Sequence, residues 1–184
     1  MNINNNNHTK NVISLKAPAK VNLFLEILGK RDDGYHEIET IMQEIDLADS
    51  LQFEETQEGV TLECNDKNIP ANQDNLVCKA ANLILEECGI KKGVLINLEK
   101  NIPVGAGLGG GSSDAATTLK ALNSLWKVGL NNEELMEFAA KLGSDIPFFI
   151  NGKTALCRGR GELITPVEVR NRMDYIILFP RVHI

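Results

Sequence analysis

The segment from Asn101 to Ala116 constrains this chain more than any other, because it concentrates glycine directly ahead of a helical pattern. Its sequence is NIPVGAGLGGGSSDAA, with five glycines between positions 105 and 111. Glycine lacks a Cβ, so it allows positive φ values and lets backbone N–H groups point at a ligand. A helix that follows such a loop adds unpaired N–H donors and a partial positive charge. The segment therefore predicts a strand–loop–helix unit that binds phosphate.

Size and composition favour one globular domain with a small ligand. The 184 residues are 43% hydrophobic and 24% charged, which is ordinary for a single folded core. A net charge of −6 argues against a nucleic acid or an anionic membrane as the partner of the whole surface. The sequence contains neither a bilayer-spanning apolar run nor a signal core at its polar start, so we expect a cytoplasmic protein. The wide spacing of the four cysteines favours reduced thiols over a zinc site.

Alternating and helical patterns together predict an α+β fold, with a mixed or antiparallel sheet and packed helices. After an Asn-rich arm at 1–11, we expect a strand at 12–28, and a charged turn at 30–34 predicts a hairpin with the segment 37–45. The expected core face of the first strand carries Val21, Leu23, Leu25 and Ile27. Strands at 47–53 and 60–64 would complete an antiparallel meander of four or five strands.

The second half of the chain mixes helices with strands. A helix is expected from Leu76 until Gly89 ends it, a second after the glycine loop and a third from 131 to 142. Ser112, Ser113 or Asp114 is the expected cap of the second helix. Further strands are expected at 94–98, 148–150, 154–157 and 175–179.

The order of residues in the glycine loop excludes two common nucleotide loops. Positions 105–110 match the GxGxxG pattern of dinucleotide-binding folds, but no acidic residue follows about 20 positions later, where the ribose would be bound. Gly111 is followed by Ser112, so the Gly-Lys-Ser/Thr ending of a Walker A loop is missing. The motifs of protein kinases are missing as well. The loop therefore belongs to another class of phosphate-binding loops.

Five segments together resemble the galactokinase, homoserine kinase, mevalonate kinase and phosphomevalonate kinase (GHMP) superfamily. They are PAKVNLFL at 18–25, DGYH at 33–36, DNLV at 74–77, the glycine loop from Pro103, and LGSDIPFF at 142–149. Their order and spacing are similar to those of the GHMP kinases that phosphorylate a cytidine-diphosphate sugar alcohol in non-mevalonate isoprenoid biosynthesis. The resemblance implies that residues 12–178 form the ATP-binding N-terminal domain, with a ribosomal-protein-like sheet.

The resemblance also implies roles for single residues. ATP would give its γ-phosphate to the 2-hydroxyl of the methylerythritol group, with Asp145 accepting the hydroxyl proton and Lys20 offsetting charge at the transferred phosphoryl group. The substrate-binding residues would be Asn22, Tyr35 and His36, the last two at the cytosine. The ATP-binding residues would be Asn75, Leu76, Lys100, Pro103, Gly105, Gly107, Leu108, Gly109, Gly110, Gly111, Ser112 and Ser113. Mg2+ is expected with ATP, and its protein ligands stay unknown, with Ser113 and Asp114 as weak candidates.

Several alternatives stay open. By their residue types alone, Lys20 and Asn22 fit an ordinary solvated strand, and Tyr35 and His36 fit edge packing of a hairpin as well as a nucleobase. The resemblance implies a second domain of about a hundred residues, toward which 179–184 would lead, so turnover by this chain would be weak or lost. Another GHMP small-molecule kinase and a nucleotide-binding fragment without turnover are the competing functions. We expect a monomer or a weak homodimer.

Overall fold

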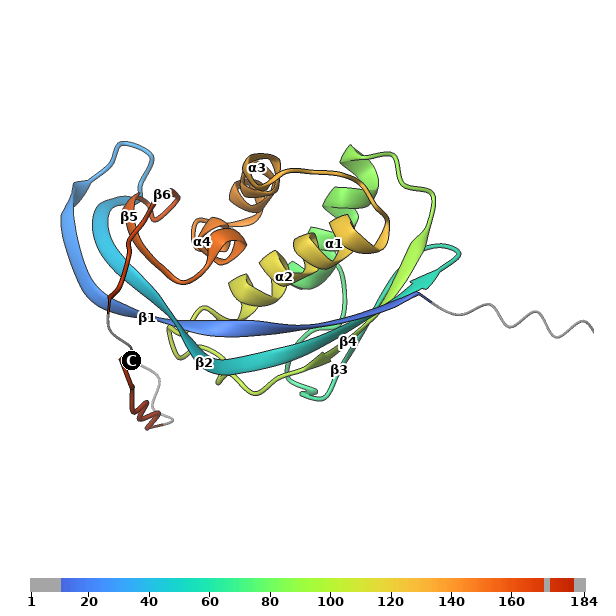
Figure 1. Cartoon of the computed structure of the whole chain (residues 1–184), viewed down its shortest axis with the longest axis horizontal. Coiled ribbons are helices and arrows are strands. Elements are labelled where there is room, and N and C mark those ends of the chain that lie inside the picture. Colours follow the sequence, from blue (N-terminus) through green and yellow to red (C-terminus); the bar gives the residue numbers. More distant parts are fainter. Residues whose placement is uncertain (1–10, 171–172, 181–184) are drawn as a thin grey trace, which may run out of the picture.

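One mixed sheet with four helices along one of its faces makes up the described part of the chain, a computed structural model covering residues 11–170 and 173–180 (Figure 1). The strands are β1 (Val12–Lys30), β2 (His36–Thr56), β3 (Val60–Cys64), β4 (Gly93–Glu99), β5 (Thr154–Gly159) and β6 (Leu163–Pro166). The helices are α1 (Leu76–Glu87), α2 (Gly110–Leu125), α3 (Asn132–Leu142) and α4 (Ile146–Asn151). The α+β class is confirmed. The predicted arm at 1–11 and crossing at 179–184 lie almost wholly outside the described residues.

Strand β2 is the central strand of the sheet and pairs with β1, β4 and β5. One of its edges pairs antiparallel with β1, from Lys30 opposite His36 to Val12 opposite Glu54, which confirms the predicted hairpin. Its other edge pairs antiparallel with β5 over residues 38–43 and with β4 over residues 50–56. Strand β2 therefore joins the hairpin end of the molecule to the end that carries the glycine loop.

Two predictions about the strands are wrong. Residues 47–53 are not a separate strand but the second half of β2, which continues past an irregularity in its pairing with β1. The meander is not wholly antiparallel, because β3 pairs parallel with β4 and α1 connects them. Strand β4 takes the place beside β2 since Val94, Ile96 and Leu98 are all buried there, whereas β3 buries only Leu62.

The three long helices are confirmed, whereas two predicted strands are wrong. Residues 148–150 lie in α4, which starts with Pro147 in its first turn and buries every residue from Ile146 to Ile150. A short, continuously apolar run has no period that separates helix from strand, so the sequence pattern could not decide. Residues 175–179 form no strand, and Ile176 there is 92% exposed. Among the described residues, no helix is long and apolar enough to cross a membrane.

The start of α2 differs from the prediction in a way that matters for the site. The helix begins at Gly110, and its N-cap is Gly109, which has a φ of 70° and offers no side-chain cap. Ser112, Ser113 and Asp114 lie inside the helix, so none of them caps it. Because the left-handed glycine turns the chain into the helix, the loop ends three residues earlier than a cap at Ser112 would place it.

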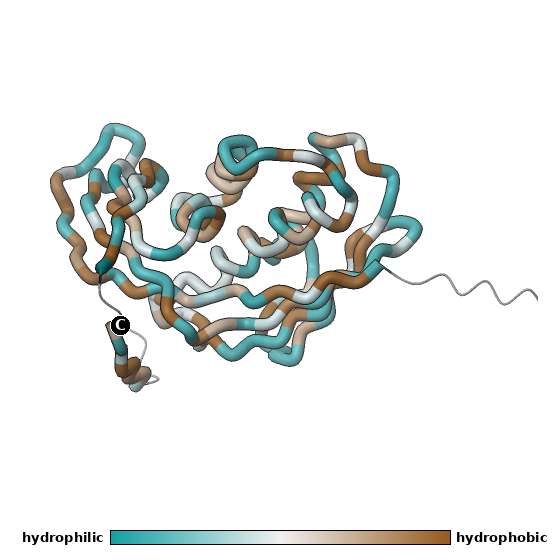
Figure 2. The backbone as a smooth tube through the Cα atoms, in the orientation of Figure 1, coloured by the Kyte–Doolittle hydropathy of each residue, from teal (hydrophilic) through white to brown (hydrophobic). Residues whose placement is uncertain are grey.

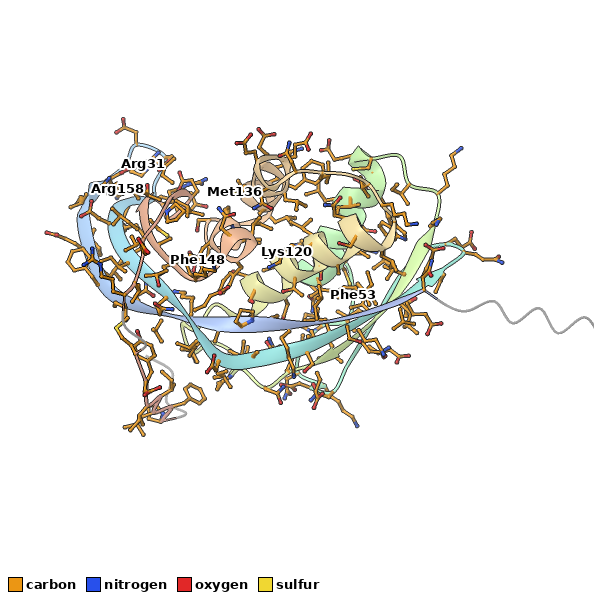
Figure 3. All side chains as sticks on the ribbon, viewed as in Figure 1. Arg31, Phe53, Lys120, Met136, Phe148 and Arg158 are labelled. Atoms are coloured by element: carbon orange, nitrogen blue, oxygen red, sulfur yellow. The ribbon has the colours of Figure 1, made fainter. Side chains whose placement is uncertain are left out.

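The core lies between the helices and the sheet, where Phe53 of β2 and Phe148 of α4 are both fully buried (Figure 3). The predicted core face of β1 is wrong beyond Val21, because Leu23, Leu25 and Ile27 are 41%, 55% and 63% exposed. Hydrophobic stretches run along this distal arm of β1 at the left of Figure 2. The helices pack over the other end of the sheet, so alternation alone predicted burial where no layer covers the strand in the described part.

Candidate active site

The glycine loop between β4 and α2 encloses a cavity of about 290 Å3 with the start of α1 and residues 68–70. Gly105, Gly107 and Gly109 have φ values of 72°, 71° and 70°, a left-handed conformation that side chains disfavour. The lining includes the predicted ATP residues Asn75, Leu76, Lys100, Pro103, Gly105, Gly107, Leu108, Gly109, Gly110 and Gly111. Ser112 and Ser113 are outside this lining, and Ser113 is fully buried.

Gly109 is the point at which the loop meets the rest of the site. A Cβ on this residue would lie 2.8 Å from Cζ of Phe149 on α4 and 3.0 Å from Cγ of Lys20 on β1. The preceding residue, Leu108, is buried, and its carbonyl oxygen accepts the backbone N–H of Lys20 at 2.9 Å. The loop is therefore packed directly against the strand and the helix that carry the two predicted catalytic residues.

Lys20 is nearly buried and is oriented by a chain of hydrogen bonds along the hairpin. Its Nζ donates to Oδ1 of Asn22 at 2.7 Å, and Nδ2 of Asn22 donates to Oγ1 of Thr40 at 2.7 Å. Thr40, on β2, is fully buried and donates to the carbonyl oxygen of Phe24 at 2.6 Å. These bonds fix the amide of Asn22, so its oxygen faces Lys20.

Asp145 lies opposite Lys20, with 3.6 Å between its Oδ2 and the Lys20 Nζ. It occupies the N-cap position of α4, yet its side chain accepts no capping hydrogen bond and is 33% exposed. At 3.6 Å the two groups attract each other without sharing a hydrogen bond of ordinary length. Asp145 thus keeps accepting capacity for a third group.

Two neighbouring residues, Lys120 and Cys157, shape the surroundings of Asp145. Lys120 of α2 donates to the carbonyl oxygen of Phe149 at 2.9 Å, which ties α4 to α2 (Figure 3 labels Lys120). Burial raises the pKa of the Cys157 thiol to about 11, and the charge of Asp145 acts in the same direction. Cys157 is therefore a neutral, buried wall of the site at physiological pH.

Tyr35 and His36 lie at the tip of the hairpin, and both are exposed. The guanidinium carbon of Arg160 lies 4.9 Å from the centroid of the Tyr35 ring, a cation–π geometry. Arg160 belongs to the turn between β5 and β6, and the next residue, Gly161, comes so near Asp145 that a Cβ there would lie 3.5 Å from its Oδ1. This turn therefore connects the hairpin tip with the Lys20–Asp145 pair.

Lys100 lines the cavity, but its ammonium group is bound to protein. Its Nζ donates to Oδ2 of Asp114 at 2.8 Å and to Oδ2 of Asp49. Burial raises the pKa of Asp114 to about 7; Lys100 opposes this rise, whereas nearby Asp49 adds to it. The Lys100 side chain is only 7% exposed. It is positioned to hold the loop in place instead of reaching into the cavity.

The weak metal candidates, Ser113 and Asp114, do not fit a magnesium site in this geometry. Ser113 Oγ and Asp114 Oδ1 have no hydrogen-bond partner, but both residues are almost fully buried, and the other oxygen of Asp114 is bound to Lys100. Mg2+ needs octahedral oxygen ligands and keeps several waters, which such buried atoms cannot accommodate. Across the described ranges, no group of three or more His, Cys, Asp or Glu side chains could hold a metal ion.

Three residues of the site escaped the sequence analysis: Thr40, Asp49 and Arg160. Thr40 and Asp49 are fully buried polar side chains on β2. A polar residue inside an otherwise core-facing strand is a signal that it has a specific partner. Arg160 lies between two glycines in the sequence GRG at 159–161, a turn pattern that indicates an exposed charge at the tip.

Comparison with known proteins agrees with this geometry. Residues 75–153 match the GHMP kinases N terminal domain. The described part of the chain has the fold of the GHMP kinase N-terminal domain. A homoserine kinase from Cytophaga hutchinsonii shares the fold at 22% identity with a TM-score of 0.67, over 88% of this chain and 52% of that one.

The chain is also similar to 4-diphosphocytidyl-2-C-methyl-D-erythritol kinases. The one from Thermoanaerobacter pseudethanolicus is 48% identical over 94% of this chain and 59% of the relative. The one from a Synechococcus species is 54% identical over 85% of this chain and 52% of the relative. A crystal structure of 4-(cytidine 5'-diphospho)-2C-methyl-D-erythritol kinase matches with a TM-score of 0.75 at 44% identity, over 84% of this chain and 55% of that one. The chain thus spans little more than half the length of these relatives.

Proposed function

We propose that this chain provides the ATP site and the catalytic pair of a small-molecule kinase. The acceptor would be 4-diphosphocytidyl-2-C-methyl-D-erythritol, phosphorylated at its 2-hydroxyl during non-mevalonate isoprenoid biosynthesis in the cytoplasm. One observation carries the proposal: at Gly109 the glycine loop packs against Lys20 and against α4, which presents Asp145. A phosphate donor held by the loop would then lie beside an ammonium and a carboxylate.

The cavity beside the loop suits a nucleoside triphosphate. Left-handed glycines leave space beside the backbone at Gly107, where a Cβ would meet no atom within 4 Å. Backbone N–H groups there and at the start of α2 favour phosphate oxygens. Leu76 and Pro103 supply apolar lining suited to a base. Mg2+ would arrive with the nucleotide, whose β and γ oxygens provide its ligands.

The catalytic pair suits transfer of a phosphoryl group to a hydroxyl. The Asp145 carboxylate would accept the proton of the attacking hydroxyl, since no helix N–H occupies its oxygens. Lys20 would offset negative charge on the transferred group, because Asn22 holds its ammonium 3.6 Å from Asp145. Phosphoryl transfer asks little more of a protein than this positioning and charge stabilisation.

The hairpin tip suits the cytidine end of the acceptor. Tyr35 offers a second ring face for stacking, because Arg160 covers one face. His36 adds a hydrogen-bonding group next to it. The relatives at 48% and 54% identity are named for this substrate, which supports the assignment over another GHMP kinase.

Binding and turnover should be measured separately on the 184-residue chain. Isothermal titration with a non-hydrolysable ATP analogue, and then with the cytidine-diphosphate substrate, measures the two affinities, and a coupled assay for ADP measures turnover. Asp145→Asn tests the base, and Glu137→Gln, an exposed charge change on α3, is its matched control. The expected result is weak ADP release by the control chain and none by Asp145→Asn.

The other outcomes separate the alternatives. Binding of both ligands without ADP release from any chain would support a nucleotide-binding fragment without turnover. Binding of ATP with indifference to the cytidine compound would support another GHMP kinase. If the analogue does not bind at all, the proposed function is wrong.

A further inference from the structure

The Asp49 side chain is fully buried beside the glycine loop, and both of its oxygens are used. Oδ1 accepts the backbone N–H groups of Asn101 at 2.5 Å and of Ile102 at 2.8 Å. Oδ2 accepts the ammonium of Lys100. One carboxylate thus binds three consecutive residues at the beginning of the loop.

The position of Asp49 in the sheet explains why it can do this. The next residue, Ser50, pairs with Glu99, the last residue of β4, so the backbone ladder between β2 and β4 ends there. Asp49 continues that ladder with its side chain where β4 leaves the sheet. Asn65, just after β3, holds the same point from the other side, since its Oδ1 accepts the backbone N–H of Lys100 at 2.8 Å.

The far end of the loop is held through Lys100. Its Nζ donates at 2.8 Å to Asp114, which lies near the start of α2, while it also binds Asp49. The loop from Asn101 to Gly109 is therefore tied at both ends to one buried cluster, Asp49–Lys100–Asp114. Burial makes these charge-assisted bonds stronger than exposed ion pairs.

We propose that Asp49 is the positioning residue of the ATP loop: it holds the loop in the nucleotide-binding conformation and does not touch the nucleotide. This inference rests on the proposed function, because it assigns the loop to ATP. A loop already held in its bound shape loses less conformational freedom on binding, so it binds more tightly. Loosening the anchor should therefore weaken ATP binding while the cytidine-diphosphate substrate binds as before.

A graded set of variants tests this role. Asp49→Asn keeps one oxygen that can accept the loop N–H groups, but it places an amide donor opposite the Lys100 ammonium. The ion pair between Lys100 and Asp114 stays in this variant. Asp49→Ala removes every bond. Glu55→Gln is the matched control, because it removes another carboxylate of β2 that pairs with a lysine, Lys92, at 2.8 Å. Hydrogen exchange by NMR reports on the amides of Asn101 and Ile102, and calorimetry reports on affinity for a non-hydrolysable ATP analogue.

We expect the two amides to exchange at least tenfold faster in Asp49→Asn than in Glu55→Gln, with ATP-analogue affinity at least tenfold weaker and acceptor affinity within twofold. Asp49→Ala should accelerate amide exchange and weaken ATP-analogue affinity more than Asp49→Asn does. If Asp49→Ala does not fold, the result for Asp49→Asn still tests the inference. Unchanged exchange of both amides, or equal weakening of both ligands, would overturn the inference. Faster exchange in a chain that never binds the analogue would instead contradict the proposed function and leave the anchor established.

Discussion

The glycine loop and the distal hairpin arm, residues 23–39, are both expected to contact substrate, yet they are held in different ways. The loop is bound by residues far away in the sequence, with Leu108 bonded to Lys20 and Asn101 bonded to Asp49. The hairpin turn is held largely by local ion pairs, since Arg31 binds Asp33 and Glu37, six residues away at most, and Arg160 adds a contact at the exposed ring of Tyr35.

This difference predicts two kinds of response to substitution. In the loop region, shape and stability depend on the same buried contacts, so a change there should weaken folding and ATP binding together. At the hairpin tip, Tyr35 is 56% exposed and its ring contacts Arg160, so a change should alter acceptor binding and leave the fold intact. The proposed nucleotide region therefore depends on buried contacts, whereas the proposed acceptor region lies on exposed residues of the hairpin.

The largest effect is expected where the two regions meet, at Asp145. Asp145→Asn should lower turnover by about 10²- to 10⁴-fold, because a general base contributes that much. ATP affinity should change little, since the carboxylate acts on the acceptor hydroxyl. Single-turnover kinetics in a chain that releases ADP measure the rate, and titration of the ATP analogue measures the affinity. Activity within tenfold of the Glu137→Gln control would show that Asp145 is not the base.

Gly109→Ala tests whether the glycine loop depends on its buried contacts. The substitution forces a side chain into a φ of 70° and places a Cβ 2.8 Å from Phe149 and 3.0 Å from Lys20. We expect a loss of about 2–4 kcal/mol in the free energy of unfolding, from strain and overpacking together. Gly129→Ala is the matched control, because its φ of 88° is also left-handed but its Cβ would meet open space.

Urea denaturation of both glycine variants separates the two causes. The Gly129→Ala loss measures backbone strain alone, and the excess in Gly109→Ala measures the contact between the loop and its two neighbours. ATP-analogue affinity should fall in Gly109→Ala only. Equal losses in both variants would mean that the packing at Gly109 contributes nothing to the site.

Much of this architecture follows from local sequence patterns, and the exceptions depend on tertiary contacts. Helices α1 and α3 begin close to the predicted residues because their caps, Asn75 and Asn131, bond to residues only two or three positions away. The start of α2 was mispredicted because left-handed Gly109 occupies the cap position expected for Ser112, Ser113 or Asp114. A polar Asp49 in a core-facing strand signals that it has a partner, but the local sequence cannot identify that partner, since Lys100 lies 51 residues away.

The same distinction applies to the two substrate regions. Lys20, Asn22 and Asp145 were assigned by resemblance to a family, and the structure brings them together within hydrogen-bonding or ion-pair distance. Periodicity could not predict that Leu25 and Ile27 are exposed, because burial of a strand depends on where helices cover the sheet. The alternating pattern identifies the strand correctly but does not identify its surroundings.

The buried cluster beneath the loop should make stability depend on pH. The folded-state pKa of Asp114 is raised to about 7, above its unfolded value near 4, so the folded chain binds more protons between these limits. The associated stability is fully present below about pH 4 and is lost as pH rises through 7, at no more than about 1.4 kcal/mol per pH unit. Asp114→Asn stays uncharged and still accepts from Lys100, so it should flatten this slope.

Urea denaturation at pH 5.5, 6.5 and 7.5 measures the slope. Asp32→Asn, an exposed acid in the hairpin turn, is the control on the other region and should keep the wild-type slope. A slope that is identical in Asp114→Asn and wild type would mean that Asp114 does not titrate in this range.

The smallest effect, and the sharpest test of the hairpin side, is expected from Tyr35→Ala. Removal of the ring should weaken binding of the cytidine-diphosphate substrate by about 3- to 10-fold, the range for loss of an aromatic stacking pair. Tyr35→Phe keeps the ring and should bind nearly as well as wild type, which separates stacking from the hydroxyl group. Because Tyr35 is mostly exposed, the free energy of unfolding should stay within about 0.5 kcal/mol of wild type. Substrate affinity and ATP-analogue affinity should be measured on the same samples. A Tyr35→Ala variant that loses both affinities would show that the hairpin tip shapes the nucleotide site. The glycine loop and the hairpin would then act as a single binding region.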